Sequence, residues 1–399
     1  MSTVANRQGP WLLLVLSVLL GFASISTDLY LPALPIMGTA LGASQGTLEM
    51  TISGYLLGFS LGQLFWGPIS DRFGRRLPLL IGLTIFVSAS AGCATASDAA
   101  QLVGFRVLQA VGASAGVVLA RAMVRDLYDR DRSARVLSTL MTIMAIAPLL
   151  GPSVGGQILA LSSWRAIFWT LVVIGLATFL AVTTLGESHP QEQRQGAAPS
   201  AVMGRYVGLL RNRAFLSYVG VIGSFYAGIF AYVAGTPFAY IQYHGLSPQL
   251  YGLVFASGTI GLMLTNVVNA WLVARLGSDR LLLVGAFGAA LFGLGTVIVS
   301  ATDWGGLPVL AGILFLYVSM NGLIAANAIA GALASVSTGA GTASALAGCV
   351  QYGGGVLGSL LVGLFSNGTP FPMGAVIGIA GIGTLACSLW TAYGRQPYA

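Results

Sequence analysis

Long apolar runs separated by short polar segments dominate the chain. Each run is close to the ~20 apolar residues that an α-helix needs to cross a bilayer. In the first half the runs cover about residues 11–37, 48–66, 77–96, 98–123, 134–161 and 164–185. In the second half they cover about residues 214–242, 248–275, 281–301, 307–333, 341–366 and 372–394. This pattern predicts an all-α membrane protein with about twelve transmembrane helices.

A single long polar stretch divides these runs into two sets of six. We interpret residues 187–213 as a cytoplasmic linker that is partly helical near its end, so the expected domains are residues 1–186 and 214–399. The polar turn 275–280 follows the second run of its set, as the segment 67–76 does in the first set. Matching layouts are typical of parallel repeats. They predict two six-helix bundles related by pseudo-two-fold symmetry, with a substrate site where the bundles meet near the membrane midplane.

Composition and charge support a lipid environment. The chain is 56% hydrophobic and 7% charged, whereas a soluble domain carries about 25% charged residues. The net charge of +7 does not indicate nucleic-acid binding, because the basic residues are all arginines spread over short loops. Most of these arginines fall on one side of the predicted membrane, which places both termini in the cytoplasm. We expect a multi-pass protein of the bacterial inner membrane.

No metal or cofactor site is expected from the sequence. The three cysteines, Cys93, Cys349 and Cys387, each lie in an apolar run without metal-ligand spacing. An enzyme would need paired carboxylates, a histidine-rich metal site or a nucleophile with its base, and the apolar runs supply none of these. A non-transporting receptor would not need two matched halves. These observations favour transport over catalysis or reception.

The segment between the second and third runs is short, charged and rich in turn-forming residues. Pro68 and Gly74 let the chain stop and turn. Three arginines, which resist translocation, hold this hairpin on the cytoplasmic side. Asp71 is either their counter-ion or a cap for another helix. The residues that form the pattern are Gly67, Asp71, Arg72, Gly74, Arg75 and Arg76.

This hairpin resembles the loop between helices 2 and 3 of the major facilitator superfamily, whose pattern is G-x-x-x-D-R-x-G-R-[RK]. The resemblance implies the major facilitator fold. It also implies a latch below the membrane, in which Arg75 pairs with Asp126 and Asp71 lies under the N-terminus of the eleventh helix, near residues 339–344. In the family such a cluster favours the state that is closed on the cytoplasmic side.

Few ionisable groups remain inside the predicted membrane. Asp28 lies roughly 10 Å from the outer end of the first helix, and Arg106 lies at a similar depth in the fourth. Buried charges are expensive in lipid, so they are functional candidates by default. We expect both to face a water-filled cavity, where burial favours the neutral acid and the nearby cation favours the carboxylate. The alternative is a static pair that only joins the two helices.

Two resemblances extend this proton-coupling hypothesis. The segment from Arg106 through Gln109 to Gly112 is similar to the family's helix 4 pattern R-x-x-Q-G-x-G, with Ala110 in place of the first glycine. In the family this arginine is implicated in proton transfer, and Gln109 could hold its guanidinium. The segment 27–35 resembles the D-x-Y-L-P-A-L-P stretch of the Bcr/CflA group of drug exporters within the drug:proton antiporters. Glu49, at the outer start of the second helix, is interpreted as interfacial, because the helix dipole favours an acid there.

The fifth run carries small residues and prolines that are typical of a hinge. Small residues at spacing four share one helix face and permit close packing. The stretch resembles the G-x-x-x-G-P-x-x-G-G signature of exporting members, with Ala147 in place of the first glycine. Ordinary membrane packing is the alternative reading of these glycines. The hinge candidates are Pro148, Gly151, Pro152, Gly155 and Gly156.

Aromatic and amide side chains in several runs are candidates for the substrate cavity, since drug pockets combine apolar walls with a few polar groups. The candidates are Tyr30, Tyr55, Met144, Tyr226, Phe230, Asn321, Gln351 and Tyr352. Together with the resemblances, they predict a monomeric, proton-coupled exporter of small hydrophobic drugs, such as phenicol- or bicyclomycin-like compounds. Its partners would be the drug, protons and the lipid bilayer. The alternative is an exporter of a sugar or another small metabolite by the same fold.

Overall fold

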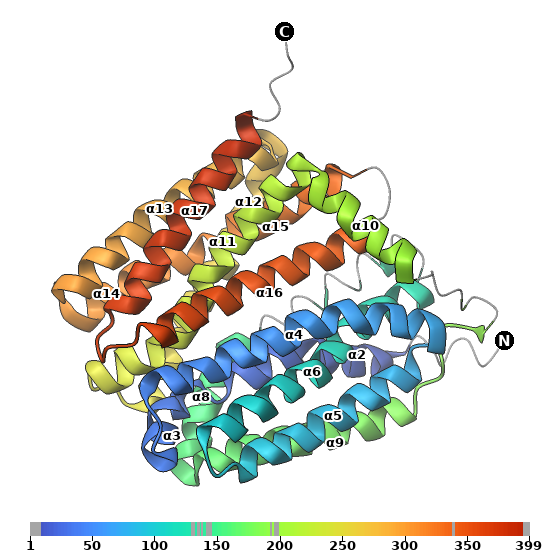
Figure 1. Ribbon diagram of the computed structural model, residues 1–399, viewed down its shortest axis with the longest axis horizontal. Helices are drawn as coiled ribbons and strands as arrows, with labels where there is room; N and C mark the ends of the chain where they lie inside the picture. The colour runs from blue at the N-terminus through green and yellow to red at the C-terminus, as the bar shows by residue number, and fades with distance from the viewer. Residues whose placement is uncertain are drawn as a thin grey trace. The chain divides into compact units, whose positions relative to one another are not determined.

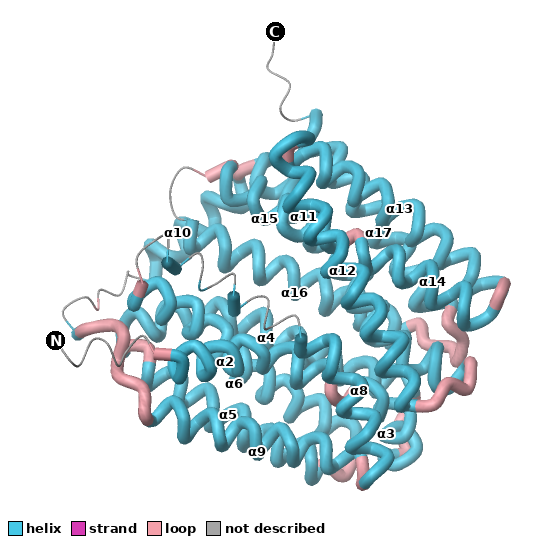
Figure 2. Tube along the Cα trace, turned by 180° about the vertical axis from the view of Figure 1, so that it is seen from behind, coloured by secondary structure: helices cyan, strands magenta, loops and turns pink. Residues whose placement is uncertain are grey.

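A computed structural model describes residues 9–128, 132–133, 136, 139–140, 146–191, 194, 199–336 and 340–393. Throughout these ranges the regular structure is helical, which confirms the predicted all-α class (Figures 1 and 2). Ten continuous helical segments of the described residues are long and apolar enough to cross a membrane, some of them made of two or three of the elements named below, and α8 is a shorter apolar helix. The chain forms two compact units, residues 1–42 with 54–197 (unit 1) and residues 43–53 with 198–399 (unit 2).

In unit 1, helix α5 packs between α6 and α9, and α2 packs on α6 and α8. Figures 1 and 2 both show α5, α6 and α9 side by side. The elements are α2 (Pro10–Asp28), η2 (Leu31–Ala33), α3 (Leu34–Leu41), α4 (Gln45–Phe73, whose first residues belong to unit 2), α5 (Arg76–Thr95), α6 (Ala99–Leu127), α8 (Ile146–Leu161) and α9 (Trp164–Thr183).

In unit 2, helix α11 packs against α16 and α17, and α17 also packs along α13 (Figure 1). The elements are α10 (Pro199–Arg211), α11 (Arg213–Thr236), the π-helical η4 (Pro237–Tyr243), α12 (Pro248–Leu276), α13 (Ser278–Thr302), α14 (Gly306–Ser319), α15 (Asn321–Ala334), α16 (Ala340–Leu364) and α17 (Phe371–Tyr393). Helix α10 confirms that the polar stretch is partly helical.

Two helix ends differ from the expected ones. The first run is not one helix: α2 ends at Asp28, and a short 3-10 turn containing Pro32 precedes α3. Helix α4 continues through Pro68 to Phe73, so the expectation that Pro68 ends the helix is wrong. Proline removes the hydrogen bond from its own nitrogen to the carbonyl four residues earlier, and α4 nevertheless continues for five residues beyond it. The reversal falls instead at Gly74, whose φ of +88° favours glycine.

Close helix crossings in unit 2 depend on glycine. A Cβ on Gly354 would overlap the carbonyl oxygen of Gly223, and one on Gly358 would overlap that of Ala227, so α16 touches the backbone of α11 directly. The adjacent Gly353 faces open space, because a Cβ added there would have no other atom within 4 Å. Without hydrocarbon exclusion to drive helices together, such backbone contact is a main source of association in lipid.

We predict that Gly354→Ala destabilises the protein by about 1–3 kcal/mol, because the added methyl group forces α16 away from α11. Gly353→Ala is the matched control, because it adds the same methyl group one residue away where there is room. Thermal unfolding in detergent should show a lower Tm for Gly354→Ala alone. Equal melting temperatures for the two variants would contradict this account of the crossing.

Candidate functional site

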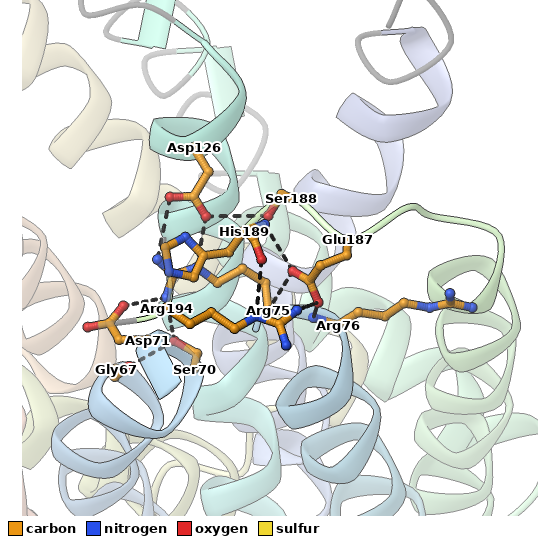
Figure 3. Close-up of polar contacts among 10 residues, drawn as sticks. All are labelled: Gly67, Ser70, Asp71, Arg75, Arg76, Asp126, Glu187, Ser188, His189 and Arg194. Atoms are coloured by element: carbon orange, nitrogen blue, oxygen red, sulfur yellow. Dashed lines mark hydrogen bonds and ion pairs between the residues drawn. The ribbon is translucent and has the colours of Figure 1, made fainter. Parts of the chain in front are cut away.

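Arg75 is the centre of a charged cluster at one end of unit 1 (Figure 3). Its guanidinium binds Asp71 at the end of α4 at 2.5 Å and Asp126 near the end of α6 at 2.8 Å. Nη1 also donates to the Ser70 hydroxyl at 2.7 Å. One buried arginine thus ties α4, α5 and α6 together, and the expected pairing of Arg75 with Asp126 is confirmed.

Glu187 completes this cluster, although its place in the sequence suggested a residue of the linker. Its two carboxylate oxygens accept hydrogen bonds from the backbone N–H groups of Arg75, at 2.8 Å, and Arg76, at 3.2 Å. These are the first amides of α5, where a negative charge is stabilised by the helix dipole. Arg194 lies 3.7 Å from Glu187 and donates to the His189 carbonyl. A glutamate directly after the sixth run was the available signal, but its partners lie more than a hundred residues away.

Gly74 fits tightly inside this arrangement. A Cβ on Gly74 would come within 2.6 Å of both the Arg194 guanidinium and the Glu187 carboxylate. The remaining hairpin residues are less enclosed. Arg76 donates to the carbonyl of Thr183 at the end of α9, Arg72 lies over the ring of Phe73, and Gly67 has open space around it.

The cluster changes the pKa of two of its members, Glu187 and Arg75. Burial of Glu187 favours the neutral acid and would raise the pKa of its carboxyl group. Hydrogen bonds from the backbone N–H groups of Arg75, His189 and Arg76, together with the charge of Arg194, outweigh this effect, so the pKa of Glu187 is lowered. Burial of Arg75 favours its neutral form, but Asp126 and Asp71 outweigh this and raise the pKa of its guanidinium. Both groups therefore stay charged over the physiological range.

A second site lies in the interior of unit 1, around Arg106 on α6. The side chain is 0% exposed. Its Nη1 donates to the backbone carbonyl of Ser26 on α2 at 2.9 Å and to Gln109 Oε1 at 2.6 Å. Gln109 in turn donates to the Ser90 hydroxyl on α5 at 2.8 Å. Gln109 therefore holds the guanidinium, as the sequence indicated, and the chain of hydrogen bonds joins three helices.

Two tyrosine rings contact the same guanidinium. The Arg106 Cζ atom lies 4.2 Å from the ring centroid of Tyr30 and 4.2 Å from that of Tyr55. Cation–π contacts of this kind gain strength when they are shielded from water. Both tyrosines are buried, so their rings contact an internal charge rather than an open wall. Sequence reasoning selected them as cavity residues and missed this contact, because it depends on three helices meeting.

Asp28, at the end of α2, is buried beside the hinge candidates on α8. Its carboxylate accepts a hydrogen bond from the Thr27 hydroxyl at 3.2 Å. A Cβ on Gly151 would lie 2.9 Å from the Asp28 Cβ, and one on Gly155 would overlap the Leu29 carbonyl oxygen. The ion pairs of the described residues do not include one between Asp28 and Arg106. The guanidinium reaches the backbone two residues earlier, at Ser26.

The other hinge candidates lie on the same helix. Pro148, Pro152 and Gly156 belong to α8, and Pro152 lies inside the helix. The glycines at 151 and 155 let α8 approach the break between α2 and η2, which is the point where Asp28 ends its helix. The small-residue face is therefore a packing surface for the segment that carries the buried acid.

Five of the cavity candidates form a cluster in unit 2. The Tyr226 hydroxyl lies close to the side chains of Asn321 and Gln351. Phe230 lies between two other rings, with centroid distances of 6.2 Å to Tyr226 and 6.1 Å to Tyr352. These residues come from α11, α15 and α16, and all five are partly exposed. Met144, the remaining candidate, lies outside the described residues.

The described residues contain no group of three or more His, Cys, Asp or Glu side chains that could hold a metal ion. The two sites of unit 1 and the cluster of unit 2 consist of charged, amide and aromatic groups, which are able to bind a proton or a small molecule.

Comparison with known proteins identifies the family. Residues 14–359 match the Major Facilitator Superfamily, and the chain belongs to it. The "Uncharacterized MFS-type transporter YdgK" of Bacillus subtilis is 35% identical and covers 94% of both chains. The "Chloramphenicol resistance protein" of Pseudomonas aeruginosa is 33% identical over 88% of this chain and 83% of that protein. The "Multidrug resistance protein D" of Escherichia coli is 30% identical over 95% of each.

The fold is also that of solved members. A D-xylose-proton symporter structure superposes with a TM-score of 0.76 and covers 96% of both chains at 18% sequence identity. Similarity at this level of identity concerns the fold alone. It supports the major facilitator architecture, while the family match and the transporter-named relatives make the protein a multi-pass membrane transporter.

The lowered pKa of Glu187 leads to a prediction of pH dependence. Because the folded pKa lies below the ordinary value of 4.5, the stability that Glu187 contributes is present above about pH 4.5 and is lost as the pH falls through the folded value. Glu187→Gln should therefore have a lower Tm than wild type at neutral pH, and the difference should shrink on acidification below that point. Asp98→Asn offers a control that also removes one carboxylate, because Asp98 is exposed and asparagine caps α6 equally well. A Tm difference that does not depend on pH would contradict an electrostatic role.

Proposed function

We propose that the protein is a proton-coupled exporter of small hydrophobic or amphipathic drugs. The observation that carries this proposal is Asp28, an acid 6% exposed in the interior of unit 1, which forms no ion pair with the fully buried Arg106 or with another described residue. A buried carboxyl that lacks a fixed cation can change its protonation when its surroundings change. Relatives named for chloramphenicol and multidrug resistance support the choice of drugs as the substrate class.

Arg106 would set the conditions under which Asp28 exchanges its proton. Its charge is held by Gln109 and by the tyrosine rings, so the guanidinium stays fixed while Asp28 titrates. Movement of α8 on its glycine face would change the access of water to Asp28, because Gly151 touches this residue directly. Proton binding and helix movement would then be coupled through one contact.

The aromatic and amide cluster of unit 2 is the proposed substrate surface. Tyr226, Phe230 and Tyr352 present rings to a hydrophobic molecule, while Asn321 and Gln351, beside the Tyr226 hydroxyl, can hydrogen-bond to polar groups of the substrate. Pockets that combine apolar walls with a few polar groups suit small drugs.

The charged cluster around Arg75 would act as a latch, with the hairpin in the cytoplasm of a bacterial cell and both termini on the same side. Helices α4, α5 and α6 and the start of the linker share one network, so all four segments must move together or the ion pairs must break. We propose that the protein is a monomer with two helix bundles, residues 1–186 and residues 214–399, and that each bundle contains one set of six apolar runs.

The direct test is drug export from proteoliposomes under an imposed pH gradient. We predict that Asp28→Asn abolishes export driven by the gradient while drug binding persists, because the asparagine cannot carry a proton. Asp98→Asn is the matched control, because Asp98 caps the start of α6 and asparagine caps equally well. Export by Asp28→Asn that still follows the gradient would refute the proposal.

Substrate contact has a separate test. Tyr226→Phe removes a hydroxyl that lies beside Asn321 and Gln351, and it should weaken the binding of polar drugs by about tenfold, equal to ~1.4 kcal/mol. The profile for apolar drugs should change little. Tyr243→Phe, at an exposed position, is the control. Resistance profiles of cells that make each variant provide the measurement, and an unchanged drug tolerance for wild type itself would favour a metabolite as substrate.

A further inference from the structure

Glu49 is buried rather than interfacial, contrary to the sequence interpretation. It is the fifth residue of α4 and belongs to the segment 43–53 that forms part of unit 2. Its side chain is 0% exposed. Glu49 is buried because segment 43–53 packs closely on α16. In an isolated helix the same side chain would be exposed to water.

The packing of the two helices depends on small residues. A Cβ on Gly46 would overlap the carbonyl oxygen of Gly363, and the Gly363 Cβ position lies 3.5 Å from the Glu49 Cβ. The hydroxyl groups of Ser53 and Ser359 hydrogen-bond at 2.9 Å. We call this contact, from Gly46 and Gly363 to Ser53 and Ser359, the α4–α16 seam.

The carboxyl group of Glu49 has little to stabilise a charge. Oε1 accepts a hydrogen bond from Gln45 Nε2 at 2.9 Å, whereas Oε2 is buried without a hydrogen-bond partner among the described residues. The ion pairs of the described part of the chain do not include Glu49. Burying an ionised carboxylate on these terms is expensive, and the neutral acid is the form that can be buried.

The two segments that form the seam carry no other charge near Glu49. Segment 43–53 contains no second ionisable residue, and Tyr55 lies further along α4. The titratable side chain of α16 nearest to Gly363 in sequence is Tyr352, about three helical turns away, and Cys349 lies beyond it. A proton is therefore the cation that this site can accept.

We propose that Glu49 is a second proton-binding site, whose protonated form closes the α4–α16 seam and whose ionised form opens it. Ionisation requires water, and water can reach the carboxylate only when α4 separates from α16. Closure is then linked to proton binding, so the seam closes as the pH falls and opens as the pH rises. The inference concerns the same proton exchange as the proposed function but does not depend on Asp28.

Cysteine labelling can follow the seam without any drug. Ser359 is fully buried in the seam, so Ser359→Cys, in a chain whose three natural cysteines are replaced, reports its opening. The protein is placed in lipid nanodiscs, where both membrane faces are accessible, and a water-soluble maleimide is added between about pH 5 and pH 9. Rates are divided by those of Asn367→Cys, an exposed position just beyond α16, which corrects for the pH dependence of thiol reactivity.

With Glu49 present, the corrected rate should rise about tenfold or more from the acidic to the alkaline end. Glu49→Gln, which is neutral and of the same shape, should keep the rate low throughout. A rate that does not change with pH in the parent chain, or a rise that survives Glu49→Gln, would overturn the inference. Unfolding of the variant would instead expose the introduced thiol at every pH, and a Tm measurement separates that case.

Asp28→Asn distinguishes this inference from the proposed function. If Glu49 acts independently, labelling of the thiol introduced by Ser359→Cys should keep its full pH response in the Asp28→Asn background, even though gradient-driven export is lost. Loss of the pH response in that background would contradict a separate site at Glu49. Normal export by Asp28→Asn would refute the first proposal and leave the seam unaffected.

Discussion

The charge of Arg106 is the constraint that organises the interior of unit 1. A guanidinium inside a membrane protein is costly unless its donors and its faces are satisfied. Here Nη1 donates to the Ser26 carbonyl of α2 and to Gln109 of α6, and the rings of Tyr30 and Tyr55 contact the planar group. Nε and Nη2 are buried without a hydrogen-bond partner among the described residues, so the rings carry much of the contact with the charge. Asp28 is left without an ion pair among the described side chains.

The two units hold their inter-helix turns in chemically different ways. In unit 1 the turn after α4 is held by ionised groups around Arg75. In unit 2 the turn between α12 and α13 includes amide and hydroxyl contacts, since Asn327 donates to Asn269 at 2.6 Å and accepts from Ser278 at 2.8 Å, and the Tyr218 hydroxyl donates to Asp279 at 2.7 Å. Ionic contacts near water weaken with salt, whereas neutral amide bonds do not. The ion pairs around Arg75 are therefore contacts that salt would weaken.

Two buried acids, Asp28 and Glu49, differ in what surrounds them. Asp28 lies beside a hinge-like helix, two residues after the Ser26 carbonyl that binds Arg106, whereas Glu49 lies in a seam of glycine and serine whose own residues carry no other charge. A transporter must keep its substrate path closed at one end while it opens the other. Each carboxyl group binds or releases its proton according to how much water surrounds it. Two acids at different positions can therefore respond separately to movements of different parts of the protein.

The helical class, the succession of membrane helices and the charged hairpin could be predicted from the sequence, because apolar length and arginine position respond directly to the bilayer. Gln109, three residues after Arg106, was also predictable, since residues at that spacing share a helix face. Contacts between distant segments were not. Glu187 joined the Arg75 cluster, Tyr30 and Tyr55 covered a cation, and Glu49 became buried. Each of these depends on how helices rotate and cross, and hydrophobic patterning leaves that rotation undefined when nearly every face of a helix is apolar.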